Sequence, residues 1–214
     1  MKLYKYRSLE KLDYVFDILS NGLVYCSSYK DLNDPFEGQF KKLYSNMQFG
    51  SSQWGDGQCG AKSPTREDLD KHYTLHQKRI CSFSLTNTDV KMWSYYADSH
   101  KGICIEFDID ENEMSDFYTV DYNADLKRVK SIDIDENIAT NILKRKTKQW
   151  DFECEVRLIT EKEKYNLKKN ISSVILGNRI SELNEGIINL IRGGIPMQYA
   201  KLTDDLKIEV KDYR

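Results

Sequence analysis

The stretch Glu-Cys-Glu-Val-Arg-Leu-Ile at residues 153–159 predicts a β-strand that carries chemistry as well as structure. Because side chains alternate along a strand, Glu153, Glu155 and Arg157 share one face, and the residues between them face the other way. Three charged side chains in a row need either solvent or a ligand. The Glu-x-Glu spacing sets the two carboxylates about 7 Å apart, so they could contact two parts of one substrate. The structural alternative is a solvated edge strand with a Glu–Arg ion pair.

The composition predicts one soluble globular domain over residues 1–214. The hydrophobic fraction is 40% and the charged fraction 31%, values that are ordinary for globular proteins. The net charge of −2 gives no global basic field and disfavours a general nucleic-acid binder. No apolar run is long enough to span a bilayer and no signal-peptide segment opens the sequence, so we expect no membrane partner and a cytoplasmic location.

Metal and disulfide frameworks are not indicated. The five cysteines are widely spread and form no Cys-x-x-Cys pair. His72 and His76 lie four residues apart on a predicted helix and could bind a metal, but no Glu-bearing zinc motif accompanies them. We therefore expect no metal site.

Strands and helices are interspersed without the regular alternation of a doubly wound fold. The pattern predicts an α+β protein with a mixed, mostly antiparallel sheet and flanking helices. Strands are expected at 3–6, 23–27, 79–85, 103–107, 117–122, 153–159, 173–176, 197–202 and 206–210. Helices are expected from a cap at Ser8 to the Asn21-Gly22 stop, from Thr65 to about 78, after a cap at Asp89, from 134 toward 150, and over 180–191. Residues 44–63 contain four glycines and little periodicity, and are expected to form a long flexible loop.

Three polar clusters fall on the predicted strands or their ends, at residues 5–8, 81–84 and 153–157. Each has a structural explanation of its own. Arg7 could pair with a surface acid, and exposed pairs of this kind stabilise a fold by only about 0–1 kcal/mol. Ser82 and Ser84 could simply satisfy backbone groups.

Taken together, the clusters resemble the Arg…Ser-x-Ser…Glu-x-Glu order of the ADP-ribosyltransferases, although that family commonly has Ser-Thr-Ser where this chain has Ser-Phe-Ser at 82–84. The resemblance implies a split sheet and NAD as the substrate. Cleavage of the nicotinamide–ribose bond passes through an oxocarbenium-like transition state, as glycoside hydrolysis does. Glu155 would stabilise that cation through the ribose 2′-OH, and Glu153 would activate the acceptor. Arg7 would hold a phosphate or the ribose of NAD.

The same resemblance implies further NAD-binding residues. Ser82 and Ser84 would brace the nicotinamide ribose and the catalytic strand. An aromatic ring, Trp93 or Tyr96, would stack on nicotinamide. The complete set expected to bind NAD is Lys5, Tyr6, Arg7, Ser82, Ser84, Trp93, Tyr96 and Arg157.

A second resemblance extends over nearly the whole chain. Six short motifs match, in order and spacing, the bacterial family called domain of unknown function 2971. They are Tyr-Lys-Tyr-Arg at 4–7, Asn-Asp-Pro-Phe at 33–36, Cys-Ser-Phe-Ser at 81–84, Trp-x-x-Tyr-Ala at 93–97, His-Lys-Gly-Ile at 100–103 and Trp-x-x-Glu-x-Glu-x-Arg at 150–157. The family has no assigned activity, and some members lie in neighbourhoods that look like phage-defence loci. The resemblance implies a bacterial toxin or phage-defence effector, with a partner or antitoxin protein.

The leading hypothesis is therefore an enzyme that cleaves NAD and transfers ADP-ribose to a protein or nucleic acid, or to water. Two alternatives stay open. The first is a metal-independent nuclease-type toxin, in which a set of basic residues gathers around a phosphate: Lys5, Arg7, His100, Lys101 and Arg157. The second is a non-catalytic module that binds a nucleotide or a partner.

Overall fold

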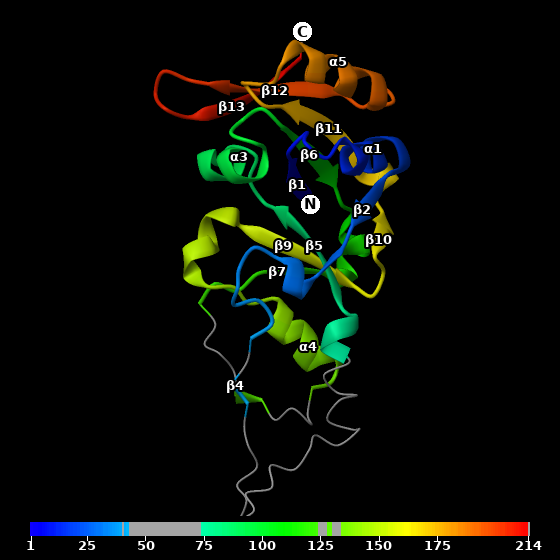
Figure 1. Cartoon of the computed structure of the whole chain (residues 1–214), viewed down its shortest axis with the longest axis vertical. Coiled ribbons are helices and arrows are strands. Elements are labelled where there is room, and N and C mark those ends of the chain that lie inside the picture. The colour runs from blue at the N-terminus through cyan, green and yellow to red at the C-terminus, as the bar shows by residue number, and fades with distance from the viewer. Residues whose placement is uncertain (40, 43–73, 124–127, 130–133, 214) are drawn as a thin grey trace, which may run out of the picture.

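The computed structural model describes residues 1–39, 41–42, 74–123, 128–129 and 134–213 (Figure 1). The fold is α+β, with a mixed, mostly antiparallel sheet and several helices, as the sequence predicts. The strands are β1 (Lys2–Arg7), β2 (Leu23–Tyr25), β3 (Ser27–Ser28), β4 (Lys41–Lys42), β5 (Arg79–Ser84), β6 (Ile103–Asp108), β7 (Phe117–Thr119), β8 (Arg128–Val129), β9 (Glu155–Thr160), β10 (Lys164–Asn166), β11 (Ile171–Leu176), β12 (Met197–Leu202) and β13 (Ile208–Asp212). The helices are α1 (Leu12–Asn21), α3 (Val90–Tyr96), α4 (Glu136–Leu143) and α5 (Glu182–Ile191), with 3-10 turns η1 (Tyr29–Asp31), η2 (Glu111–Asp116), η4 (Lys148–Glu153) and η5 (Lys168–Asn170).

The main sheet has the strand order β13-β12-β11-β6-β1-β5-β9-β7, and β3 pairs with β5 beside this path. Neighbouring strands run antiparallel, with the exception of the parallel pair β11 and β12. β2 with β10, and β4 with β8, form two small separate pairs.

The sheet is split between β1 and β5. These two strands share the single register pair Tyr4–Ser84, whereas β1 pairs with β6, and β5 with β9, over six residues each. In Figure 1 the half that contains β1, β6 and β11 lies above the half that contains β5, β9 and β7. We call the space between β1 and β5 beyond the Tyr4–Ser84 pair the fork. Whether this split corresponds to the sheet of the ADP-ribosyltransferases stays a prediction.

Helices cover both faces of β1. Leu3 packs in a buried cluster with Val15 of α1, whereas Tyr6 packs in another with Trp93 of α3. Odd and even residues of a strand point to opposite faces, so α1 and α3 lie on opposite faces of the sheet. A third buried cluster packs α4 against the half that contains β5 and β9; it includes Ile80, Ile142, Leu143 and Ile159.

Several predicted element ends are confirmed and others are wrong. Gly22 adopts φ +72° and ends α1, and the Asp89 carboxylate accepts a hydrogen bond from the amide of Met92 at the start of α3. The predicted cap at Ser8 is wrong, since its hydroxyl accepts only from the amide of Glu10 and α1 begins at Leu12. The predicted strand 23–27 is two strands with different partners, β10 and β5. The predicted helix toward 150 ends at 143, the strand 117–122 ends at 119, and the strand 206–210 lies at 208–212.

The strand predicted at 153–159 begins two residues later than expected. Glu153 is the last residue of η4, and Cys154 turns the chain with φ +44° before β9 starts at Glu155. β9 lies between β5 and β7, so the alternative of a solvated edge strand is wrong. Glu153, Glu155 and Arg157 are 4%, 3% and 0% exposed.

Two expectations lie outside the described residues, namely the 44–63 loop and His72. Residues 74–77 are helical, in agreement with the last part of the helix predicted to end at about residue 78. Within the described ranges, no helix has the length and apolar character needed to cross a membrane.

The close contact between Gly102 and β1 gives a test of the fold. A Cβ atom at Gly102 would lie 2.2 Å from the carbonyl oxygen of Arg7 and 3.0 Å from Ala97 Cα, both main-chain atoms. Gly102→Ala should therefore destabilise the protein by about 1–3 kcal/mol, the range typical of overpacking, in urea unfolding. Gly186, within α5, has nothing within 4 Å of its added Cβ. Gly186→Ala should instead stabilise by about 0.5–1 kcal/mol, and equal effects at both positions would contradict the packing.

Candidate functional site

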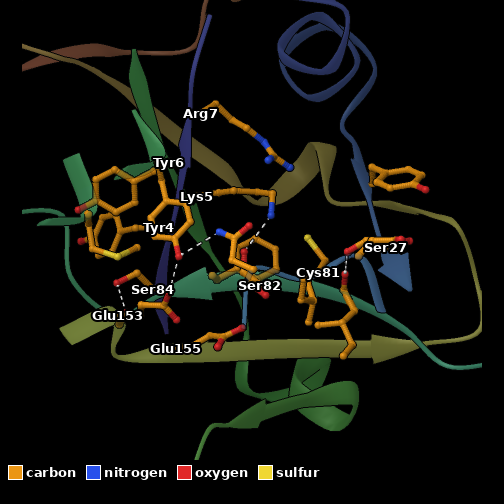
Figure 2. Close-up of a pocket in the computed structure, with 18 of the residues that line it drawn as sticks. Tyr4, Lys5, Tyr6, Arg7, Ser27, Cys81, Ser82, Ser84, Glu153 and Glu155 are labelled. Carbon is orange, nitrogen blue, oxygen red and sulfur yellow. Dashed lines mark hydrogen bonds between the residues drawn. The ribbon is translucent and has the colours of Figure 1, made fainter. Parts of the chain in front are cut away.

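A pocket of about 490 Å³ opens at the fork (Figure 2). Its lining comes from β1, from β5, from the start of β9 and from α3, so the two halves of the sheet both contribute. Eight of the ten residues expected to form the site line it: Lys5, Tyr6, Arg7, Ser82, Ser84, Tyr96, Glu153 and Glu155. Segments far apart in the sequence therefore meet at one pocket, although Arg7 and Glu155 reach it from opposite faces of the sheet.

The lining residues approach the pocket from opposite faces of the sheet. Lys5 and Arg7 alternate with Tyr4 and Tyr6, and therefore share the face of Leu3 and the main core. Ser84 pairs with Tyr4 across the fork and with Glu155 on its other side, which places the carboxylates on the second face. Because the strands separate beyond the Tyr4–Ser84 pair, the pocket reaches both faces. The pocket therefore has a cationic side, with Lys5 and Arg7, and a carboxylate side, with Glu153 and Glu155.

Glu155 is held at the carboxylate side by two cations. Its Oε1 accepts from Arg157 Nε at 2.9 Å, and its Oε2 accepts from Arg157 Nη2 at 3.0 Å and from Lys146 Nζ at 3.2 Å. The Ser82 hydroxyl lies near this carboxylate and also lowers its pKa. Burial raises the pKa of Glu155, but the charges of Arg157 and Lys146 outweigh it and lower the pKa to about 2. Glu155 is therefore ionised at neutral pH.

Arg157 lies beneath the pocket and does not line it. Its guanidinium makes a two-pronged ion pair with Glu37, at 2.8 Å from Nη1 and through a second contact from Nη2, and Nη1 also donates to the carbonyl of Leu143. Burial lowers the pKa of Arg157, but the two carboxylates outweigh this and raise it. The prediction that Arg157 binds NAD directly is wrong in this geometry, because its donors are used within the protein.

Glu37 reaches Arg157 from the segment of the Asn-Asp-Pro-Phe motif. The Asp34 carboxylate accepts from the amide of Phe36 at 2.9 Å, and the carbonyl of Asp34 accepts from the amide of Glu37 at 3.1 Å. This is the Asx-type turn that such a motif favours. Burial raises the pKa of Glu37 against the opposing effect of Arg157. The motif thus forms a turn that places the Glu37 carboxylate against the buried guanidinium of Arg157.

Glu153 differs from Glu155 in its surroundings. The hydroxyl of Tyr96 donates to Glu153 Oε1 at 2.5 Å, and Lys146 pairs with Oε2. The main-chain carbonyl of Glu153 accepts from the Ser84 hydroxyl at 2.7 Å, which joins the end of η4 to β5. Burial raises the pKa of Glu153. The pKa values of the two neighbouring carboxylates are therefore shifted in opposite directions, and Glu153 takes up a proton more readily than Glu155.

The cationic side contains Lys5 and Arg7. Lys5 Nζ donates to the carbonyl oxygen of Ser82 at 2.8 Å across the fork and lies 5.0 Å from the centre of the Phe83 ring. Arg7 Nε is buried without a hydrogen-bond partner, and Arg7 forms no ion pair with any residue the structure describes. Burial lowers the pKa of both groups. A buried cation with unused donors is suited to an anionic ligand, and the surface-acid alternative for Arg7 is wrong in the described part.

Trp93 does not line the pocket. Its ring is fully buried, it meets Tyr6 edge-on at 5.2 Å, and its Nε1 donates to the carbonyl of Asn87 at 2.8 Å. The predicted stacking of Trp93 on nicotinamide is therefore wrong, and Trp93 is a core residue. Tyr96 does line the pocket, with its hydroxyl directed to Glu153.

The five basic residues of the nuclease hypothesis do not gather. Only Lys5 and Arg7 line this pocket, His100 and Lys101 are not in its lining, and Arg157 is enclosed by carboxylates. For the metal candidate, His76 Nδ1 shares a hydrogen bond of 3.0 Å with the Tyr29 hydroxyl. Among the described residues there is no group of three or more side chains that could hold a metal ion.

Sequence reasoning missed Lys146, Glu37 and Cys81. Lys146 lies in a short run of basic and polar residues after α4 that gives no periodic signal. Glu37 follows a recognisable turn motif, but nothing local indicates that it pairs with a residue 120 positions away. Cys81 belongs to the polar cluster at 81–84 but is not among the residues expected to bind NAD, although it lines the pocket.

Comparison with known proteins identifies one family. The model of the family described as Protein of unknown function (DUF2971) matches residues 92–158. The match supports the second resemblance over less than half of the chain, from α3 to β9, and includes Tyr96, Glu153 and Glu155. No curated protein and no solved structure matches the chain. The site must therefore be interpreted from its own geometry.

The buried ion pair between Arg157 and Glu37 predicts a large effect on stability. Glu37→Ala leaves the guanidinium with one carboxylate partner fewer in the protein interior, and should cost about 3–5 kcal/mol of unfolding free energy. Lys211→Ala removes the exposed pair with Glu209 on β13 and should leave the free energy nearly unchanged. Urea unfolding of both variants measures this. A small effect of Glu37→Ala would show that the pair does not organise the site.

The lowered pKa of Glu155 predicts an acid-dependent contribution to stability. The folded protein favours ionised Glu155, whose pKa falls from 4.5 to about 2. Its stabilisation is therefore fully present above about pH 4.5 and is lost as the pH falls toward 2. The difference in unfolding free energy between the natural protein and Glu155→Gln should shrink over that range. A difference that stays constant from pH 6 to pH 2 would contradict the assignment.

Proposed function

We propose that the fork pocket binds NAD, cleaves the bond between nicotinamide and ribose, and transfers ADP-ribose to a macromolecule. The observation that supports this proposal is that Arg7, whose buried Nε has no hydrogen-bond partner, and two carboxylates of opposite pKa tendency line a single pocket. NAD has the complementary chemistry, with a pyrophosphate and a ribose whose C1′ becomes cationic on cleavage. The pocket volume of about 490 Å³ lies within the range of about 300–1,000 Å³ of small-molecule sites.

Glu155 provides the fixed negative charge in this scheme. It is ionised at neutral pH and is held from two sides by Arg157 and Lys146, so it needs no reorganisation when positive charge develops on the ribose. Its contact with Lys146, at 3.2 Å, is longer than its contacts with Arg157. A ribose 2′-OH would therefore replace Lys146 on Oε2 and leave the Arg157 pair intact.

Glu153 is the acid–base group of the scheme. Burial raises its pKa, and a carboxylate with a raised pKa is better suited to act as a general acid or base. It would take the proton of the acceptor nucleophile as the new bond to C1′ forms. Tyr96 orients this carboxylate through its hydroxyl.

In this scheme the cationic side of the pocket binds the phosphates of NAD. Arg7 has a buried Nε without a hydrogen-bond partner, and Lys5 lies beside it on the same strand. Guanidinium donors match phosphate oxygens well. With the pyrophosphate at Arg7 and the ribose at Glu155, a bound NAD would extend through the fork from one face of the sheet to the other.

The acceptor and the biological setting are part of the proposal. A protein or nucleic acid would receive ADP-ribose, and water would give NAD hydrolysis at the same site. Consumption of NAD or modification of a macromolecule in the cytoplasm would be toxic, which fits a bacterial toxin or phage-defence effector controlled by a partner or antitoxin protein.

Incubation of the purified protein with NAD, alone and with cell lysate, tests the proposal through released nicotinamide and labelled macromolecules. Glu155→Gln and Glu153→Gln should each lower the rate of nicotinamide release by about 100-fold or more. Tyr96→Phe removes no charge and should lower it by about 10-fold, the loss of one good hydrogen bond. Glu209→Gln, on the exposed face of β13, is the matched control and should not change the rate.

Circular dichroism of each variant separates a loss of chemistry from a loss of folding. Release that is independent of Glu155 in a folded variant would reject the assigned chemistry. No release by the natural protein in either sample would reject the enzyme and favour the second candidate.

The second candidate is a nucleotide-binding module without turnover. The observation that favours it is that Arg157, Lys146 and Ser82 already engage the Glu155 carboxylate. If no ligand displaces Lys146, the carboxylate cannot reach a ribose. Calorimetry would then show binding of NAD, and chromatography would recover it intact after long incubation.

A further inference from the structure

Two cysteines face each other at the cationic side of the fork. β3 and β5 pair through Ser27–Ile80 and Ser28–Arg79, and this antiparallel register, continued by one residue beyond β3, brings Cys26 opposite Cys81. Opposite residues in antiparallel strands have Cα atoms about 4.5 or 5.5 Å apart, which lies within the range of about 4.4–6.8 Å that a disulfide spans. The two thiols are free, and both residues belong to the buried cluster of the main core. Cross-linking them requires no rearrangement of the sheet.

The surroundings of Cys81 favour a thiolate. Cys81 lines the pocket, and Lys5 and Arg7 add two positive charges nearby. Figure 2 shows the sulfur of Cys81 directed to the side on which Lys5 and Arg7 end. Burial raises the pKa of Cys81, but the neighbouring Cys26 thiol and the two cations outweigh it and lower the pKa. A thiolate, rather than a thiol, is the nucleophile in cysteine chemistry.

The other described cysteines lack this combination. Cys26 is fully buried and does not line the pocket, and the neighbouring Cys81 thiol, together with burial, raises its pKa. Cys104 is buried on β6 outside the pocket, and burial raises its pKa. Cys154 is exposed and has its pKa raised by partial burial and nearby acids. Cys81, although only 1% exposed, therefore combines a place in the pocket lining with two nearby cations and a neighbouring thiol.

We propose that Cys81 and Cys26 form a redox-active dithiol that opens on the pocket, in which Cys81 reacts with a small hydroperoxide and Cys26 completes a disulfide. The Cys81 thiolate attacks one oxygen of the hydroperoxide, the O–O bond breaks, and the leaving oxygen takes a proton to give water from hydrogen peroxide. Cys81 is then a sulfenic acid. The sulfur of Cys26 attacks it, the S–O bond breaks, and a second water leaves. Two thiols are oxidised and one peroxide is reduced to two waters.

The disulfide would change the charge of the pocket. A thiolate beside Lys5 and Arg7 neutralises part of their positive charge, whereas a disulfide carries none. Oxidation would therefore make the full positive charge of Lys5 and Arg7 available to an anionic ligand. The thiol chemistry itself does not depend on whether that ligand is NAD.

The experiment uses the full chain in a Cys59→Ser, Cys154→Ser background, which retains Cys26, Cys81 and Cys104. The folded protein is exposed to hydrogen peroxide, quenched, unfolded and alkylated, and its thiols are located by peptide mass mapping. The expected result is a Cys26–Cys81 disulfide with Cys104 still reduced. In Cys26→Ser, a sulfenic-acid trapping reagent should label Cys81 at least about 10-fold faster than Cys104, as the lower pKa of Cys81 requires.

The Cys81→Ser variant is the matched partner, and in it Cys26 should not be labelled. Three free thiols after peroxide treatment of the background protein would overturn the proposal. So would labelling of Cys26 in the absence of Cys81, or equal labelling of Cys81 and Cys104. Because the readout is the state of sulfur, it is independent of nicotinamide release, and the two proposals can fail separately.

Discussion

A guanidinium without access to solvent imposes the main constraint on this structure. Arg157 lies on an interior strand at 0% exposure, so its charge and its donors must be satisfied by the protein. Glu155, Glu37 and the carbonyl of Leu143 do this. These partners come from β9 itself, from the turn after η1 and from the end of α4. One buried cation thereby determines where three segments meet, and it fixes the carboxylate that the pocket exposes.

The split of the sheet depends on the pairing of β5, which lies next to the strand that carries Arg157. β5 pairs with β9 over six residues and with β3 over two, while it shares one register pair with β1. Lys5 partly replaces the missing pairing, because its ammonium donates to the carbonyl of Ser82. A main-chain hydrogen bond between strands would close the fork. A side-chain donor in its place satisfies the carbonyl and still leaves room for the pocket.

The sequence predicts the parts of this protein whose signals are local. Gly22 ends α1 and Asp89 begins α3 because each acts on adjacent backbone groups. The contacts between distant segments had no such signal: Glu37 meets Arg157 across 120 residues. Trp93 was misassigned because an aromatic residue on an amphipathic helix has the same pattern whether it packs in a core or on a ligand. The clusters around Arg7 and Glu155 could be predicted as polar strand residues, but only the fork shows that they share a pocket.

The arrangement of charge across the fork separates two groups of residues. The cations Lys5 and Arg7 lie on one face of the sheet, and the carboxylates of Glu153 and Glu155 lie on the other. Lys5 and Arg7 lie on the face of the main core, where burial lowers their pKa and leaves donors unused. Glu153 and Glu155 lie on the other face with Lys146 between them. Arg157 and Glu37 form an ion pair and neutralise each other, whereas Arg7 and Glu155 lie on opposite faces of the sheet. Strand alternation keeps them apart, so each remains able to act on a ligand that passes through the fork.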